Sequence, residues 1–411
     1  MTSGRPDLRN ILGLLAGRRA TWAEIDLDAL RDNLTAVRAH CGDRPIWAVV
    51  KADAYGHGAS ACARTLVSAG ASGLVVALPD EGVALRAAGI EAPILIAGAL
   101  PTGAVDILID HDLMPALSSV RDLDRFAAAA SRRECRPTYH LELDTGMTRM
   151  GLSPADLPAF LDAAGRTGRC EMGAVFSHLA GVHDPAGAGA RSQLARLQEL
   201  AGQVVHRLGH AVPCHLAASP AVCAFDEAWL DGIRPGLLLY GVRPDEALTP
   251  PAGLRQVLSL RTAVALVRQV PAGRAVGYDG TFVTPSATRI AVLSAGYADG
   301  LNRAAAGRAE ALLGGNRCPY RGAVNMDLAQ VDVGPRTAVE DGSIATLIGT
   351  DGEDRITIEE LADRTERTPY EWLTGVGARV PRIYIEHHEI TGSYTPATYQ
   401  QPSANDVSAP S

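Results

Sequence analysis

Short apolar runs alternate with longer amphipathic stretches over roughly the first 240 residues of the chain. The apolar runs are rich in β-branched residues and predict strands at Ile46–Ala52, Gly73–Leu78, Pro93–Ala97, Leu113–Leu117, Thr138–Asp144, Gly173–Leu179, Pro213–Ala217 and, interrupted by Pro235 and Gly236, Trp229–Arg234. The stretches between them predict helices at Ala59–Ala69, Asp80–Ala88, Val120–Ala130 and Arg191–Leu208. Continuous apolar strands separated by helices indicate an α/β fold with a parallel sheet covered on both faces. Eight units within about 220 residues fit a closed TIM-type (β/α)8 barrel better than an open sheet.

The pattern changes beyond about Arg255, where glycine and proline punctuate shorter apolar runs. Strands of a largely antiparallel domain are predicted at Gln256–Val270, Arg289–Leu293, Glu310–Leu313, Gln330–Val333 and Ile344–Ile348. Thr357 and Glu360 form a capping-box pattern that opens a helix over Ile358–Arg367. We therefore expect an N-terminal extension over 1–20, the barrel over 21–254, a C-terminal β-rich domain over 255–392 and a disordered tail over 393–411.

Composition narrows the classes of function. A length of 411 residues favours two domains, and a net charge of -8 argues against nucleic-acid and anionic-membrane partners. No apolar run approaches the roughly 20 residues of a membrane span. The seven cysteines are odd in number and never spaced as Cys-x-x-Cys, which argues against a zinc cluster or a disulfide framework. We expect a cytoplasmic enzyme without a metal site.

The number of lysines in the chain is unusual. Lysine and arginine total 38, but Lys51 is the single lysine, so arginine supplies the other 37 (38 − 1). Lys51 follows the first strongly apolar strand, and strand ends face the active site of a barrel. A lysine desolvated there has a lowered pKa and can form a Schiff base. An exposed surface lysine is the alternative, and position alone does not separate aldolases from pyridoxal phosphate enzymes.

The segment Val50-Lys-Ala-Asp-Ala-Tyr-Gly-His-Gly58 resembles the cofactor-lysine signature of alanine racemases, which are fold type III pyridoxal phosphate enzymes. The resemblance continues in order at Leu143-Asp-Thr-Gly-Met147, Arg149-Met-Gly151, Ser177-His178, Arg234-Pro-Gly236, Leu239-Tyr-Gly241, Gly277-Tyr278, Gly296-Tyr-Ala-Asp-Gly300, Met326-Asp327 and Arg379-Val-Pro-Arg382. Each match is short, and their order from about Trp22 to Tyr384 carries the resemblance.

The resemblance implies two acid–base groups. Lys51 would hold the cofactor covalently, and Tyr278 would reach the opposite face of the cofactor from the partner subunit of a homodimer. Racemisation needs a base on one face and an acid on the other. Taken alone, Tyr278 between glycine-rich neighbours also fits an ordinary turn residue.

The resemblance also assigns the cofactor and substrate contacts. Arg234 would face the pyridine nitrogen, supported by His215, although an arginine before Pro-Gly also fits a loop anchor. The phosphate would be bound by Tyr55, Ser219, Tyr370 and the amides of Gly236 and Leu237, with His178 beside the ring. Ser219 before Pro220 is equally typical of a helix cap. Arg149 and Met326 would contact the substrate carboxylate, and Tyr297 and Asp327 would line the entrance.

The chain departs from the family pattern near the site. Glu142 stands where many relatives carry a carbamylated lysine, so we predict a direct Glu142–Arg149 contact, with a routine surface glutamate as the alternative. Asn325, Ala323 and Ala218 replace a common cysteine, arginine and asparagine, respectively. These changes leave the mechanism intact but weaken the expectation of strict alanine specificity.

The leading hypothesis is a pyridoxal phosphate-dependent amino-acid racemase acting on alanine, with serine or a broader range of amino acids as the alternative. A fold type III decarboxylase would carry a cysteine acid in place of Tyr278. A non-enzymatic pyridoxal phosphate-binding barrel has a single domain, which the β-rich segment argues against.

Overall fold

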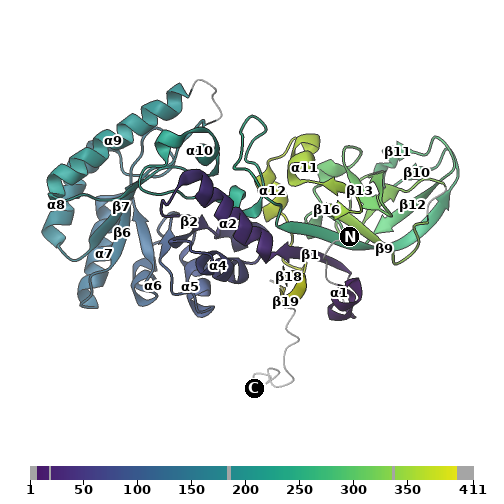
Figure 1. The fold of residues 1–411 in the computed structure, drawn as a ribbon, viewed down its shortest axis with the longest axis horizontal. Coiled ribbons are helices and arrows are strands. Elements are labelled where there is room, and N and C mark those ends of the chain that lie inside the picture. Colours follow the sequence, from purple (N-terminus) through teal and green to yellow (C-terminus); the bar gives the residue numbers. More distant parts are fainter. Residues whose placement is uncertain (1–6, 18–19, 183–186, 336–337, 396–411) are drawn as a thin grey trace, which may run out of the picture. The chain divides into compact units, whose positions relative to one another are not determined.

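The computed structural model describes residues 7–17, 20–182, 187–335 and 338–395 (Figure 1). Its contacts divide the chain into two compact units. Leu27–Val257 form one, which we call the barrel unit. The described residues up to Asp26 join those from Leu258 onward in the other, which we call the strand-rich unit. The described residues contain no helix with the length and apolarity that a membrane crossing requires.

The barrel unit contains seven parallel strands whose order in the sheet is their order in the sequence. They are β2 (Trp47–Val49), β3 (Gly73–Val76), β4 (Ile94–Ile96), β5 (Met114–Leu117), β6 (Thr138–Glu142), β7 (Glu171–Phe176) and β8 (Cys214–His215). The helices are α2 (Leu27–Cys41), α3 (Lys51–Gly56), α4 (Ala59–Ser68), α5 (Pro79–Ala87), α6 (Ala104–Asp110), α7 (Val120–Arg132), α8 (Leu157–Thr167), α9 (Ala188–Leu208) and α10 (Ser219–Ala224). Strands β3 and β4 are buried along their whole length, as a sheet covered by helices requires.

An eighth extended segment closes the ring of strands. The amide of Trp47 donates to the carbonyl of Ile233 at 2.9 Å, and the amide of Arg234 donates to the carbonyl of Ala217 at 2.8 Å. Parallel bridges on both sides place this segment between β8 and β2. Pro235 has no N–H and cannot continue the ladder, so the segment stays too short to form a regular strand. The predicted barrel is therefore confirmed, with its weakest strand reduced to these bridges.

The strand-rich unit is built around a ten-stranded sheet with the path β14-β13-β16-β9-β1-β18-β19. Its strands are β1 (Thr21–Asp26), β9 (Leu258–Val270), β12 (Thr288–Leu293), β13 (Glu310–Leu313), β14 (Asn316–Pro319), β15 (Ala329–Asp332), β16 (Ile344–Asp351), β17 (Asp354–Ile356), β18 (Arg382–Glu386) and β19 (Glu389–Tyr394). A two-stranded ribbon, β10 (Ala275–Val276) and β11 (Phe282–Val283), and helices α1 (Leu8–Leu14), α11 (Ile358–Thr365) and α12 (Pro369–Thr374) complete it. The capping bond from the Glu360 amide to Thr357 Oγ1 is present at 3.0 Å.

The domain boundary expected at residue 21 is wrong. Strand β1 pairs antiparallel with β9 and parallel with β18, so it belongs to the strand-rich unit. Trp22 is fully buried in a cluster with Ile11, Leu15 and Ile383. This cluster packs the N-terminal segment against β18. The expected tail begins too early, because β19 extends to Tyr394, and residues 396–411 lie outside the described residues.

Candidate active site

Lys51 begins a backbone turn of unusual conformation. The first barrel strand ends at Val49 rather than at the predicted Ala52, and Lys51 opens α3. The residues Ala52–Tyr55 all have left-handed φ angles of 53–54°. That conformation costs an L-residue roughly 1–2 kcal/mol. The carboxylate of Asp53 holds the turn by accepting the amide of Ala59 at 2.7 Å. Strain that the surroundings hold in place is typical of a functional site.

The side chain of Lys51 lies within the electrostatic reach of two charged residues. Desolvation and then the positive charge of Arg149 lower the pKa of Lys51, and the carboxylate of Glu81 opposes them. A lowered pKa leaves more of the amine unprotonated near neutral pH, and the unprotonated amine is the form that attacks a carbonyl. The site therefore favours a nucleophilic lysine.

Arg234 is buried on the segment that closes the barrel. Its Nη1 donates to Nδ1 of His215 at 2.5 Å and to the carbonyl of the same residue at 3.0 Å. Its Nη2 donates to the carbonyls of Ser177 and Leu216 at 2.7 and 3.2 Å. The remaining donor of the guanidinium, Nε–H, has no acceptor among the described residues. Burial lowers the pKa of Arg234 to about 10, so the guanidinium stays charged at neutral pH.

Two buried histidines continue this arrangement into the barrel. His215 accepts from Arg234 at Nδ1, so its Nε2 carries the proton and donates to Nδ1 of His140 at 3.1 Å. Burial, followed by the charge of Arg234, lowers the pKa of His140 to about 4 and that of His215 well below its usual value. His215 also stacks on Phe176 with ring centroids 5.0 Å apart. The geometry agrees with the predicted support of Arg234 by His215 and adds His140.

Hydroxyl and amide groups gather where the closing segment meets α10. Oγ of Ser219 accepts the amide of Gly236 at 2.8 Å. A Cβ at Gly236 would lie 2.6 Å from the hydroxyl of Tyr55, so a larger residue there would displace that hydroxyl. The buried amide of Leu237 has no hydrogen-bond acceptor among the described residues. Four of the five predicted phosphate-binding residues thus lie together, and the fifth, Tyr370, lies on α12 of the strand-rich unit.

Arg149 and Glu142 do not form the predicted direct contact. No hydrogen bond or ion pair joins them in the part of the chain that the structure describes. Burial raises the pKa of Glu142, while the charges of Arg234 and then Arg149 lower it. The prediction came from the resemblance, in which a glutamate replaces a carbamylated lysine, and such a replacement does not fix the distance between two side chains. His178 is subject to the same positive charges. Burial lowers its pKa to about 3, and the charges of Arg234, Arg149 and Lys51 act in the same direction, so its imidazole is neutral at neutral pH.

The remaining predicted residues belong to the strand-rich unit. Tyr278 is 69% exposed and follows Gly277, which has a φ of 75°. Met326 is 53% exposed, and its carbonyl accepts the amide of Ala298, next to Tyr297. Asp327 pairs with Arg379 at 2.7 Å, and Arg379 also binds the buried carboxylate of Asp299 at 2.8 Å. These bonds tie the loop of Tyr297 to the loop of Met326.

Two functional candidates, Glu81 and His140, were given no role from the sequence. Glu81 accepts the backbone amide of Ala52, the residue after Lys51, at 2.6 Å. An acidic residue in the first turn of a helix is too common to single out from sequence. His140 could have been found, because strand alternation places it on the same face as Glu142.

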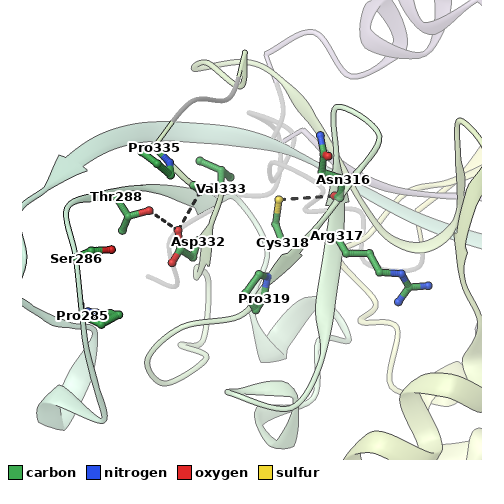
Figure 2. Close-up of a pocket in the computed structure, with 11 residues that line it drawn as sticks. Pro285, Ser286, Thr288, Asn316, Arg317, Cys318, Pro319, Asp332, Val333 and Pro335 are labelled. Atoms are coloured by element: carbon green, nitrogen blue, oxygen red, sulfur yellow. Dashed lines mark hydrogen bonds between the residues drawn. The ribbon is translucent and has the colours of Figure 1, made fainter.

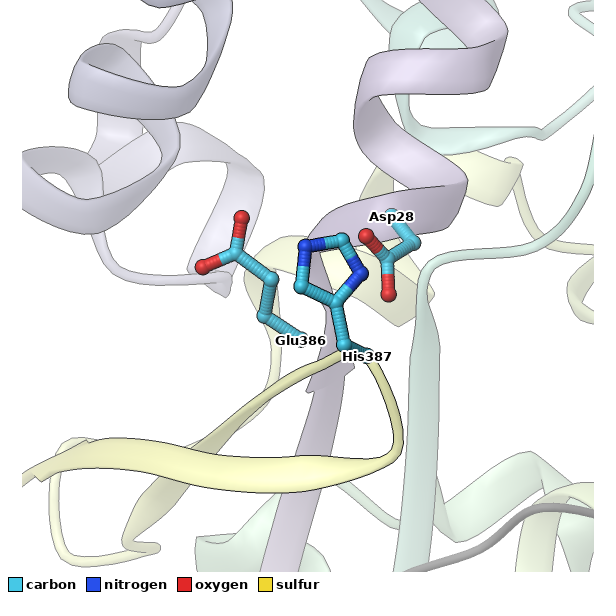
Figure 3. A group of neighbouring side chains, drawn as sticks. All are labelled: Asp28, Glu386 and His387. Carbon is cyan, nitrogen blue, oxygen red and sulfur yellow. The ribbon is translucent and has the colours of Figure 1, made fainter.

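Two further features lie apart from these residues in the strand-rich unit. A pocket of about 520 Å³ is lined by residues that include Thr288, Cys318 and Asp332, and contains none of the predicted site residues (Figure 2). Thr288 Oγ1 donates to Asp332 there at 2.6 Å. The turn between β18 and β19 carries Glu386 and His387 (Figure 3). Neither feature adds to the lysine site.

The strand ends of the barrel unit thus combine a reactive amine, an arginine that can only donate hydrogen bonds and a cradle for an anion. This combination of groups, at the strand ends of a (β/α)8 barrel, suits the binding of a phosphorylated carbonyl compound. Models of the alanine racemase N-terminal domain and C-terminal domain match residues 25–244 and 257–384. The chain belongs to the alanine racemase family, whose activity is that of an isomerase.

Individual relatives agree with the family models over nearly the whole chain. The alanine racemase of Frankia casuarinae is 39% identical over 369 residues, which are 88% of this chain and 96% of that protein. The structure of alanine racemase from D-cycloserine-producing Streptomyces lavendulae matches with a TM-score of 0.86 and 37% identity, over 90% of this chain and 99% of that one. Alanine racemase from Bartonella henselae with covalently bound pyridoxal phosphate matches with a TM-score of 0.80 and 28% identity, over 89% and 99%.

Proposed function

We propose that this protein interconverts L- and D-alanine and uses pyridoxal phosphate held by Lys51. The observation that carries the proposal is the position of the single lysine: it begins the strained turn at the barrel strand ends, within electrostatic reach of Arg149 and His178. Because no other side chain of the protein is an amine of this kind, Lys51 has no rival for the covalent attachment.

The residues at the strand ends fit the cofactor. The unused Nε–H of Arg234 suits the pyridine nitrogen, and Ser219, Tyr55 and the amides of Gly236 and Leu237 suit the phosphate. When bound, pyridoxal phosphate supplies a sink for the electrons released at the substrate α-carbon. Arg234 would hold the ring nitrogen by a hydrogen bond and would leave it unprotonated, because the guanidinium keeps its own protons at neutral pH. An unprotonated ring would be a weaker electron sink, which would favour return of the proton to the α-carbon.

Two groups move the α-proton. Lys51 takes or returns it on one face of the substrate, and Tyr278 does so on the other. Arg149 and the amide of Met326 hold the substrate carboxylate. Glu142 supplies a negative charge that Arg149 and Arg234 share without an ion pair. Asn325 and Ala323 make the entrance less charged, so serine and longer amino acids are the alternative substrates.

Tyr278 acts in the barrel of a second copy of the chain. It is exposed on the strand-rich unit together with Val283, Met326 and Leu328, whose exposed fractions are 53%, 53% and 38%. The proposed assembly is a homodimer with shared active sites. The seven unbridged cysteines support a reducing compartment, in keeping with a cytoplasmic supply of D-alanine.

The test is α-proton exchange. The purified protein is incubated with L-alanine in deuterium oxide, and deuterium at the α-carbon and formation of D-alanine are followed together by NMR and chiral chromatography. We expect both, and neither with Lys51→Ala. A panel with serine and longer amino acids measures the substrate range. Release of carbon dioxide with an amine product would favour a decarboxylase, and absence of exchange with every amino acid would reject racemisation.

A further inference from the structure

The carboxylate of Glu81, in the first turn of α5, accepts three backbone amides. Its Oε1 accepts the amide of Ala52 at 2.6 Å. Its Oε2 accepts the amides of Ala77 and Leu78 at 2.8 and 3.0 Å. Both oxygens are therefore used as acceptors, and each holds a different stretch of backbone.

Helix capping explains one of these bonds. A glutamate at the third helical position commonly accepts the amide of the residue before the helix, which is Leu78 here. The bond to Ala52 reaches a different element. Ala52 follows Lys51 after β2, and β2 and β3 are parallel neighbours in the barrel. Glu81 therefore joins the ends of two adjacent strands, and one of the joined residues is next to the lysine.

The bond acts at the point where the chain is strained. Ala52 is the first of the four consecutive left-handed residues that follow Lys51. A bond to its amide fixes the peptide that links Lys51 to this run. The same carboxylate is also the negative charge that acts on the Lys51 ammonium, against the positive charge of Arg149.

We propose that Glu81 is a positioning residue for Lys51: its carboxylate fixes the backbone of the lysine turn to the neighbouring strand and supplies the counter-charge of the amine. The inference rests on the proposed function, in which Lys51 holds the cofactor and moves the α-proton. It adds a residue that acts through Lys51 and touches neither substrate nor cofactor.

The single lysine makes a direct test practicable. Full-length protein labelled with ¹³C-lysine gives the Cε signal of one residue, whose chemical shift is followed against pH after the cofactor has been removed with hydroxylamine. Glu81→Gln, Glu81→Asp and Asp80→Asn are compared with the parent. Asp80 is the matched control, because it is an exposed acidic residue in the same first turn and has no hydrogen bond to the lysine turn among the described residues.

Glu81→Gln loses the charge and one of the two acceptor oxygens, so we expect the pKa of Lys51 to fall. Release of the turn moves the amine, and a misplacement near 1 Å lowers kcat/KM by about 100-fold. Glu81→Asp keeps the charge but reaches less far, so the pKa of Lys51 should stay closer to the parent value while kcat/KM remains low. Asp80→Asn should change neither quantity.

The inference is overturned if Glu81→Gln gives the titration curve of the parent and of Asp80→Asn, with kcat/KM within twofold of both. If Glu81→Gln does not fold, the same comparison is made with Glu81→Asp: an unchanged kcat/KM there rejects positioning by the carboxylate. The Lys51 titration does not depend on turnover. A protein without racemase activity but with the expected titration would therefore contradict the proposed function and leave the Glu81 contact supported.

Discussion

Lys51 and Tyr278, the two proposed acid–base groups, lie in turns that both contain left-handed residues but differ in how they are held. The turn at Lys51 has four such residues and is held by the carboxylates of Asp53 and Glu81. The turn at Tyr278 has left-handed Gly277, Asp279 and Gly280, and its tyrosine side chain is 69% exposed. A strained turn with many bonds positions its lysine within its own unit. An exposed tyrosine gains a fixed position only when another surface covers it, which supports the proposed dimer.

Lys51→Ala tests the acid–base group of the barrel unit and should have the largest effect on activity. We expect kcat/KM to fall by at least about 10⁴-fold, because the covalent attachment and one proton-transfer group are lost together. Borohydride reduction followed by peptide mapping should label Lys51 in the parent and no side chain in the variant. A cofactor adduct elsewhere in the variant would contradict the assignment.

Tyr278→Phe tests the acid–base group of the strand-rich unit. Loss of one acid–base group should lower kcat by about 10²- to 10⁴-fold. Stability should change by less than about 0.5 kcal/mol, because the hydroxyl lies on an exposed side chain. Turnover is measured in both directions, and urea unfolding checks the stability.

Mixing the two inactive variants separates shared from separate sites. In a mixed dimer of Lys51→Ala and Tyr278→Phe subunits, one shared site has both native groups. Random exchange of subunits should therefore restore about one quarter of the parent sites. Sites contained within one chain would give no recovery.

Breaking a buried ion pair should have a smaller effect than the substitutions above, and this effect is on stability. Glu24 pairs with Arg261 at 2.8 Å in the strand-rich unit, and both side chains are at most 10% exposed. Glu24→Gln leaves the arginine charge buried without a partner, so the free energy of unfolding should fall by about 3–5 kcal/mol. The control is Asp32→Asn in the barrel unit, where the pair with Arg255 is more than half exposed and should contribute less than about 1 kcal/mol. Equal losses in urea unfolding would contradict this contrast.

The smallest expected effect is a dependence of stability on pH. The pKa of His140 is about 4 in the folded barrel, below its ordinary value of about 6.5. The unfolded chain therefore binds the proton first, and this contribution to stability is present above pH 6.5 and is lost as the pH falls toward 4. His140→Gln should flatten the fall in unfolding free energy over this window. An unchanged slope would show that His140 is protonated alike in both states.

Much of the fold could be predicted, because buried parallel strands are continuous apolar runs whose positions are visible locally. Strand β1 could not, because its partners β9 and β18 lie more than two hundred residues away and its own six residues suit either unit. The predicted Glu142–Arg149 contact was wrong because it rested on the residue types that relatives carry. A residue type does not fix the distance of a side chain on β6 from a residue in a loop.

The sequence by itself determined that Lys51 is the one lysine and so the one candidate for the proposed covalent attachment, since a count of one lysine needs no structure. It also determined the barrel, since periodicity and length suffice for strand–helix alternation. Only the tertiary structure decided how Lys51 is held. Its turn runs through four left-handed residues that no propensity predicts, and it is fixed by Glu81 in the first turn of α5. Contacts between segments distant in sequence depend on the exact path of the backbone, which local patterns do not encode.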